Sequence, residues 1–309
     1  MKSDVTVVIP TRNRPERVVH AVESALAQTY PIAEVVVVVD GPDDATVTAL
    51  GAIGDIRVRP IVLATSDGGN NARNVGAANA KTEWVAFLDD DDEWLPNKLE
   101  RQLAVAGDND IVGCRFIART SKGEAVWPKR LPAEGERFGD YLFSRRSFFN
   151  GEAGVITSTL LVRKQLIERI PFSLQLKRHQ ETDWVIRTTS QGSRIVYAPE
   201  SLVIFNDDSG RVRVSTSYNW RQSLEWIRGV RVQMSPRAYS GFLLVSAGAA
   251  ASDQRDWKAF QPILKEAFTL GRPTARHLLL YFAMWAVPQR MRQSLRSWIS
   301  LKRRTSILP

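Results

Sequence analysis

Apolar residues fall into short runs separated by polar segments in the first third of the chain. Val5 to Ile9 and Val35 to Val39 consist of apolar or β-branched residues without alternation. Such runs predict strands buried on both faces, as in a parallel sheet covered by helices. Between them, Pro15 suits the first turn of a helix, and Val18 and Val22 recur at helical spacing, which predicts a helix with one apolar face.

The same alternation of strands and helices continues to about residue 105. Further strands are predicted over 57–63 and 84–88, and helices over 71–80 and 96–105. This βαβ rhythm predicts an α/β fold, a mostly parallel sheet with helices on both faces. Its ligand site is expected at the carboxyl ends of the strands.

The rest of the chain changes character twice. Residues 107–150 are mixed, strands resume over 155–162 and 194–197, and the pattern then becomes helical to the end. We therefore predict a catalytic or binding domain over 1–205 and a helical C-terminal region over 206–309.

The most conspicuous polar cluster is the run of four aspartates from Asp89 to Asp92, directly after a predicted strand. Adjacent carboxylates repel one another unless a cation lies among them. Oxygen ligands of this kind suit Mg²⁺ or Mn²⁺, which also bind substrate phosphates. The alternative is an acidic turn at a helix start, since Glu93 and Pro96 follow.

Five motifs occur in order between residues 5 and 200, and the last of them consists of two segments. They are VVIPTRNR (7–14), VVVDG (37–41), ARNVG (72–76), FLDDDDEW (87–94), and DWVIR (183–187) with RIVYAPE (194–200). Together they resemble the motifs of family 2 glycosyltransferases, which have the GT-A fold. The resemblance covers about two-thirds of the chain and implies sugar transfer from a nucleotide-sugar donor.

The resemblance also implies a donor site at the strand ends. It makes Asp40 the acceptor for a ring N–H of the donor's base, which suits uracil, thymine or guanine and disfavours adenine. UDP-, dTDP- or GDP-sugars are therefore expected. The other donor-binding residues that it implies are Pro10, Thr11, Arg12, Arg73, Asp89 and Asp90.

For the metal, the resemblance identifies a D-x-D pair. Asp91 is expected to bind Mg²⁺ or Mn²⁺ most directly, and Asp89 to reach the ribose or the metal. Because four aspartates are adjacent, the register of the pair stays open.

For the catalytic base, the resemblance points to the segment His179 to Asp183. Glu181 aligns with the family's catalytic acid, and Gln180 stands where the family commonly has Glu. Inverting transfer needs one carboxylate that takes the proton from the attacking acceptor hydroxyl. Glu181 is therefore the expected base, with Asp183 as the alternative.

Charge and cysteine content limit the cellular compartments and the kinds of site that fit this chain. The formal net charge is +9, and residues 276–309 hold seven Lys or Arg with no Asp or Glu. The single cysteine, Cys114, excludes a disulfide scaffold or a four-cysteine zinc site and fits a reducing compartment. With no signal-peptide pattern at the N-terminus, we expect a cytoplasmic protein.

The end of the chain predicts a surface contact. Met291, Leu295, Trp298 and Ile299 share one helical face, with basic residues around them. Basic amphipathic helices bind anionic membranes, so we expect peripheral attachment to the inner face of the cell membrane and a glycan or lipid-linked acceptor. The alternative is a helix packed on the domain. Nucleic-acid binding is disfavoured because no base-stacking module accompanies the charge.

Three other functions fit the sequence less well. A sugar-phosphate nucleotidylyltransferase would have a glycine-rich loop after the first strand, whereas Thr11 to Pro15 contain no glycine. A non-catalytic relative that binds nucleotide-sugar or glycan would have an empty base position, but Glu181 and Asp183 are present. Dinucleotide oxidoreduction is disfavoured because no G-x-G-x-x-G follows the first strand.

Overall fold

The strands of the computed structural model form one nine-stranded sheet within the residues that it describes, which are 5–121, 123–148, 151–207 and 219–287. The strands are β1 (Val5–Thr11), β2 (Glu34–Val39), β3 (Val58–Val62), β4 (Trp84–Phe87), β5 (Glu93–Trp94), β6 (Ile111–Thr120), β7 (Gly123–Trp127), β8 (Leu161–Arg163) and β9 (Ile195–Asp207). Their order is β3-β2-β1-β4-β8-β6-β9-β5, with β7 paired to β6. The first four strands are parallel, and β8 runs antiparallel to β4 and β6.

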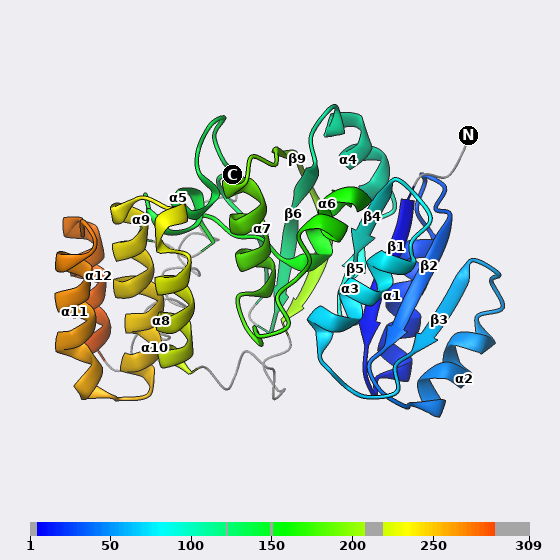
Figure 1. The fold of residues 1–309 in the computed structure, drawn as a ribbon, viewed down its shortest axis with the longest axis horizontal. Coiled ribbons are helices and arrows are strands. Elements are labelled where there is room, and N and C mark those ends of the chain that lie inside the picture. The colour runs from blue at the N-terminus through cyan, green and yellow to red at the C-terminus, as the bar shows by residue number, and fades with distance from the viewer. Residues whose placement is uncertain (1–4, 122, 149–150, 208–218, 288–309) are drawn as a thin grey trace, which may run out of the picture. The chain divides into compact units, whose positions relative to one another are not determined.

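Two helix layers cover the parallel part of this sheet, which lies in Figure 1 between β3 and β4. The helices of this unit are α1 (Pro15–Leu26), α2 (Asp44–Ala52), α3 (Gly69–Asn79), α4 (Lys98–Ala106), α6 (Lys164–Arg169) and α7 (Gln180–Ser190), with the 3-10 turn η1 (Thr157–Thr159). Val7 and Ile9 of β1 share a core cluster with the apolar face of α1. Val8 points to the other face, where α3 packs on β1 and β2.

Gly76 explains how closely α3 approaches the sheet. A Cβ atom at this position would lie 2.3 Å from Val8 Cγ1 and 3.2 Å from Val38 Cγ2. Only a residue without a side chain lets helix and strands come this near. The sequence prediction of an α/β fold with helices on both faces of the sheet is confirmed.

The predicted strand over 155–162 is largely wrong. Residues 157–159 form the 3-10 turn η1, and only β8 at its end is extended. The turn brings Ser158 to the end of β4, as described below. The mixed region also contains β6, which begins at Ile111 and is the long partner of β9.

The chain divides into two compact units. The first comprises residues 1–134 and 151–214, and the second comprises 135–150 and 215–309. Sequence patterning placed one boundary after residue 205 and assigned 135–150 to the first domain. The structure groups that segment with the helical unit, because its helix α5 (Phe138–Phe143) packs on α9 (Pro236–Gly241).

The second unit is helical throughout its described part (Figure 1). Besides α5 and α9 it contains α8 (Trp220–Gly229), η2 (Arg231–Gln233), η3 (Phe242–Ala247), α10 (Gly248–Asp253), η4 (Trp257–Ala259), α11 (Phe260–Thr269) and α12 (Ala275–Ala286). The π-helical segment η3 contacts α8, α9, α10, α11 and α12, so it forms the centre of this unit.

Within the described residues, none of the helices combines the length and apolar character required for a transmembrane span. The predicted amphipathic segment with Met291, Leu295, Trp298 and Ile299 lies outside the residues that the structure describes.

Candidate active site

The acidic segment follows β4 at the point where the strand order reverses, beside the end of β1. The Asp89 N–H donates to Ser158 Oγ over 3.0 Å, and that hydroxyl donates to Asp92 Oδ2 over 2.5 Å. The Trp94 indole N–H donates to the Ser158 carbonyl over 2.9 Å. Fully buried Ser158 therefore holds both ends of the segment in place.

Asp90 is tied to the end of β1. Thr11 Oγ1 donates to one of its carboxylate oxygens over 2.8 Å, and Arg14 donates to the other over 2.8 Å. Burial raises the pKa of Asp90, while Arg14 and the Thr11 hydroxyl act to lower it. Burial, followed by the charges of Asp89 and Asp91, raises the pKa of Asp92 well above its usual value. The positive charge of Arg14, which lies near both Asp90 and Asp91, thus offsets part of the repulsion expected among four aspartates.

The four aspartates differ in exposure. The side chains of Asp89 and Asp91 are 29% and 22% exposed, whereas that of Asp90 is 7% exposed and residue Asp92 is 4% exposed. One residue therefore separates the two accessible carboxylates, which is the spacing of the predicted D-x-D pair. Asp91 also lies 3.6 Å from the Arg14 guanidinium.

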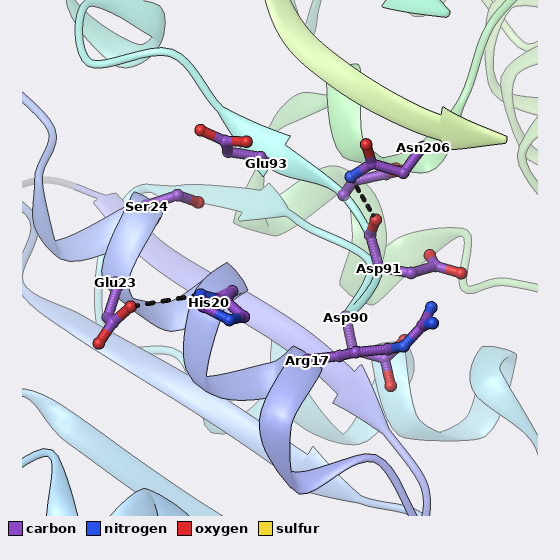
Figure 2. Close-up of a pocket in the computed structure, with 9 residues that line it drawn as sticks. Arg17, His20, Glu23, Ser24, Asp90, Asp91, Glu93 and Asn206 are labelled. Carbon is purple, nitrogen blue, oxygen red and sulfur yellow. Dashed lines mark hydrogen bonds and ion pairs between the residues drawn. The ribbon is translucent and has the colours of Figure 1, made fainter. Parts of the chain in front are cut away.

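A cavity of about 480 Å³ opens on the α1 side of this segment. Figure 2 shows Arg17 and His20 of α1 facing the part of the chain that carries Asp90 and Asp91. Asn206, near the end of β9, closes the other side, and its side-chain amide donates to the Asp91 carbonyl over 2.9 Å.

Arg73 of α3 joins the acidic segment to the start of α7. Its guanidinium donates to Asp89 Oδ1 over 2.5 Å and to Gln180 Oε1 over 2.9 Å. A third hydrogen bond goes to the Asn70 side chain over 3.3 Å. Because Arg73 is only 6% exposed, these three acceptors compensate the cost of burying its positive charge.

The two candidate bases lie in different environments on α7. Asp183 is 4% exposed and accepts a hydrogen bond from Arg187 over 2.6 Å, one turn along the same helix. Glu181 is partly buried, and burial raises its pKa. Among the smaller influences on this pKa, the charge of Arg73 lowers it and the charge of Asp89 raises it.

Asp40 lies at the end of β2 and organises the loop before α3. Its carboxylate accepts hydrogen bonds from the Ser66 hydroxyl at 2.8 Å and from the backbone N–H groups of Asp67 and Gly68. Arg12 in turn donates to Ser66 Oγ over 2.6 Å. Predicted donor residues from the ends of β1 and β2 are thus connected through one loop, while Pro10 is buried within β1.

A sequence profile described as "Glycosyl transferase family 2" matches residues 6–170, just over half of the chain. The chain belongs to glycosyl transferase family 2. The predictions of the family and of a transferase are therefore confirmed, and a sugar-phosphate nucleotidylyltransferase has no support. The profile match ends before α7, so Glu181 and Asp183 lie outside it.

Relatives of this family 2 chain include proteins of polysaccharide synthesis. The succinoglycan biosynthesis protein ExoO of Rhizobium meliloti (strain 1021) is 45% identical over 100 residues, which are 32% of this chain and 29% of ExoO. The amylovoran biosynthesis glycosyltransferase AmsB of Erwinia amylovora is 25% identical over 244 residues, which are 75% of this chain and 79% of AmsB. The match thus spans less than a third of ExoO but most of AmsB.

Solved glycosyltransferases have the same fold. TarS of S. aureus in complex with UDP-GlcNAc aligns with a TM-score of 0.61 at 18% identity, over 94% of this chain and 92% of that one. The mannosyltransferase PcManGT of Pyrobaculum calidifontis, in complex with GDP-Man and Mn²⁺, aligns with a TM-score of 0.60 at 18% identity, over 96% and 84%.

The residues around the acidic segment fit a divalent ion that shares its ligands with a substrate. Among the residues that the structure describes, no three His, Cys, Asp or Glu side chains form a group that could hold a metal by themselves. Mg²⁺ is usually held by one or two carboxylates, with substrate phosphates and water completing its shell. The accessible carboxylates of Asp89 and Asp91 provide such a partial set.

Several residues that build this site are not among the predicted site residues. Arg14 lies inside the first quoted motif, where its contact with Asp90 and Asp91 has no sequence signal. Ser158 and Asn206 are distant in sequence from the acidic segment, and only folding brings them to it. Gln180 had a signal, because it replaces a common Glu, but its bond to Arg73 was not expected.

Proposed function

We propose that this family 2 glycosyltransferase moves a sugar, with inversion at the anomeric carbon, from a nucleoside-diphosphate sugar to a glycan or lipid-linked acceptor. The names of ExoO and AmsB support a place in polysaccharide synthesis. The complexes of TarS with UDP-GlcNAc and of PcManGT with GDP-Man support a nucleotide-sugar donor.

The observation that carries this proposal is the link made by Arg73. One buried guanidinium contacts Asp89 in the acidic segment and Gln180 beside Glu181. A donor whose phosphates lie at the acidic segment would therefore have its anomeric carbon near the start of α7. In this proposal the carboxylate beside the reacting bond is that of Glu181.

Glu181 is the proposed base. Its carboxylate takes the proton from the acceptor hydroxyl as that oxygen attacks the anomeric carbon, and the bond from that carbon to the diphosphate breaks. The nucleoside diphosphate leaves with the bonding electron pair, and the proton stays on Glu181. A raised pKa suits this role, because the ideal pKa of a general base lies near the working pH.

Asp183 fits a supporting role instead. It is 4% exposed, and one oxygen of its carboxylate accepts a hydrogen bond from Arg187 over 2.6 Å within α7. Of the two alternatives that the sequence leaves open, we take Glu181 as the base, because its side chain is less buried than that of Asp183.

Asp40, Thr11, Arg12 and Arg73 are the proposed donor-binding residues. A carboxylate at Asp40 can accept the ring N–H of uracil, thymine or guanine in addition to its loop contacts, since each oxygen has two lone pairs. Asp91 and Asp89 would hold Mg²⁺ or Mn²⁺, and the ion when bound neutralises the charge that develops on the leaving diphosphate.

The basic C-terminal segment supports an acceptor held at a membrane. Residues 288–309 contain six Lys or Arg and no acid. Attraction to anionic lipid would keep the enzyme peripheral, on the inner face of the cell membrane, beside a lipid-linked acceptor.

A panel of UDP-, dTDP- and GDP-sugars tests the donor. Donor hydrolysis and the shift in melting temperature are measured for each sugar with and without Mn²⁺. We expect one nucleotide class to stabilise the protein and to be hydrolysed only with the metal. An adenine nucleotide-sugar that performs best, or full turnover in EDTA, would contradict the proposal.

A further inference from the structure

Helix α12 exposes a face without a single polar residue. Its solvent-exposed positions are Ala275, Leu279, Phe282, Ala283 and Ala286, which recur along one side of the helix. Leu279 is 61% exposed and Phe282 is 47% exposed. A surface helix normally places charged or polar residues on its outer side, so this side of α12 (orange-red in Figure 1) has the composition of a contact surface.

Aromatic residues extend this surface beyond α12. Trp257 is 62% exposed and its ring lies 4.8 Å from that of Trp285. Phe260 contacts both Trp257 and Phe282, with ring centroids 6.4 Å and 6.0 Å apart. We name the exposed side of α12 together with Trp257 the α12 face. Tryptophan is the residue that prefers the boundary between water and lipid.

Positive charge borders the α12 face. Lys258 follows Trp257, and Arg272 precedes the helix by three residues; both are exposed. Of the acids in this part of the chain, Asp256 pairs with Arg221 at 2.7 Å and Glu266 pairs with Arg228 at 2.5 Å, whereas Asp253 is exposed.

The charge of the whole unit agrees with this local pattern. Residues 135–150 and 215–309 contain 18 Lys or Arg and 6 Asp or Glu, a formal charge of +12. The other unit contains 24 and 27, a formal charge of −3. A second copy of the chain would bring a like-charged unit against this face, whereas an anionic partner would be attracted to it.

We propose that the α12 face binds an anionic lipid surface, with Leu279, Phe282 and Trp257 entering the headgroup region. The basic segment 288–309 follows α12 directly and adds six positive charges to the same unit. Apolar insertion and charge attraction then act together, as reversible peripheral binding requires. The purpose of this contact would be to bring the enzyme to a lipid-linked acceptor, and only this purpose rests on the proposed function.

Co-sedimentation of the full-length chain with vesicles tests this contact. Vesicles of phosphatidylcholine alone are compared with vesicles that also contain phosphatidylglycerol, at low and high salt. The test variant combines Leu279→Gln and Phe282→Gln, which removes apolar surface without changing charge. The matched control combines Ile56→Gln and Val232→Gln, two apolar residues that are 100% and 81% exposed elsewhere.

We expect the wild-type chain and the control to bind the anionic vesicles, and the test variant to bind at least tenfold more weakly at the same melting temperature. Equal binding by the test variant would overturn the role of the α12 face, as would a wild-type chain that stays in the supernatant. No donor or acceptor is present, so this result is independent of hydrolysis and of the proposed function.

A fluorescent probe reports insertion directly. Because the single cysteine, Cys114, is buried, a polarity-sensitive dye would label an introduced Leu279→Cys selectively. We expect a water-like emission in the free protein and a blue shift with anionic vesicles, but no shift for dye at Val232→Cys. A blue-shifted emission without vesicles that is lost when residues 288–309 are deleted would show that this segment covers the face. A dimer that the double glutamine variant dissociates would show a second copy there. Either outcome would overturn the proposal.

Discussion

The two units of this chain differ in net charge and in the kind of side chain that stands out in each. The first buries charged side chains such as Arg73, Asp90 and Lys98, and it carries a formal charge of −3. The second carries +12 and exposes Leu279, Phe282 and Trp257 to solvent. Burying a charge and exposing an aromatic ring are both unfavourable for an isolated folded chain. We relate the buried charges to the proposed phosphate-bearing donor and the exposed aromatic residues to the proposed lipid surface.

In the first unit, hydrogen bonds from three side chains converge on one place. Arg73, Arg14 and Ser158 each contact an aspartate of the segment that follows β4. Such preorganised charge suits a phosphate-bearing substrate. The comparison predicts that changes in the first unit alter chemistry or folding, whereas changes on the α12 face leave both intact.

The largest effect is expected at the proposed base. Glu181→Gln should lower the turnover rate by about 10²- to 10⁴-fold, the range that general base catalysis supplies, with little change in donor affinity. In the wild type, turnover should rise with pH through the raised pKa of Glu181, because only the ionised carboxylate accepts the proton. Steady-state rates of transfer over a pH series check both expectations.

Asp183→Asn is the control for this prediction. It keeps the shape of α7 but weakens the contact with Arg187, so we expect a lower melting temperature and less than about a tenfold change in turnover. A larger loss of turnover in Asp183→Asn than in Glu181→Gln would show that the base lies two residues further along the helix.

A smaller loss is expected at the D-x-D pair. Asp91→Ala should weaken Mn²⁺-dependent donor binding by about two orders of magnitude, since a bound divalent ion contributes several kcal/mol. Titration of the donor with and without Mn²⁺ measures this difference. Asp108→Ala, an exposed acid at the end of α4, should behave as wild type. Unchanged Mn²⁺ dependence in Asp91→Ala would rule out Asp91 as a ligand.

The pH dependence of the free energy of unfolding tests the burial of the Lys98 amine. It is fully buried, donates to Gln102 over 2.6 Å and lies 4.0 Å from the centre of the Trp94 ring. Burial lowers its pKa to about 8, with the neighbouring Cys114 acting in the opposite direction. In the unfolded chain the amine keeps its ordinary pKa of 10.5.

Between pH 8 and pH 10.5 the Lys98 amine therefore binds a proton in the unfolded chain that it does not bind in the folded chain, so its contribution to stability should rise with pH in this window. The difference between the pKa of Lys98 in the unfolded chain and in the folded chain corresponds to about 3 kcal/mol in the free energy of unfolding. Urea unfolding of the wild type and of Lys98→Met, compared at pH 7.5 and pH 10, checks it. Identical pH dependence in the two proteins would contradict a protonation change at Lys98.

Packing of α3 on the sheet gives a moderate effect. Gly76→Ala places a methyl group 2.3 Å from Val8 Cγ1, so neighbouring atoms must move and we expect a loss of about 1–3 kcal/mol in stability. Gly51→Ala in α2 is the matched control, since no atom lies within 4 Å of its new Cβ. It should be neutral or slightly stabilising. Equal melting temperatures for the two variants would disprove the close approach.

The smallest effect is expected in the second unit. Deleting residues 288–309, or combining Leu279→Gln with Phe282→Gln, should leave donor hydrolysis within about twofold of wild type and the melting temperature nearly unchanged. Transfer to a lipid-linked acceptor in anionic vesicles should fall. If either change lowers hydrolysis and thermal stability together, these residues support the fold, and the contrast between the two units fails.

Much of the fold followed from local pattern. The unbroken apolar runs at β1 and β2 and the helical spacing from Pro15 identified strands and a helix whose bounds agree within two residues. The 155–162 segment failed because its composition does not distinguish a strand from the turn at Thr157. Hydrophobic period reports burial, and both conformations are buried here.

The sequence by itself determined the family, the α/β class and the residue types at the strand ends, because these depend on short motifs and on period. Only the tertiary structure decided which groups meet: Arg73 with Gln180 across 107 positions, and Thr11 with Asp90 across 79. It also decided that Asp89 and Asp91 are the accessible carboxylates and that one side of α12 is left uncovered. Exposure and pairing depend on what the rest of the chain packs against each residue, and no local pattern carries that information.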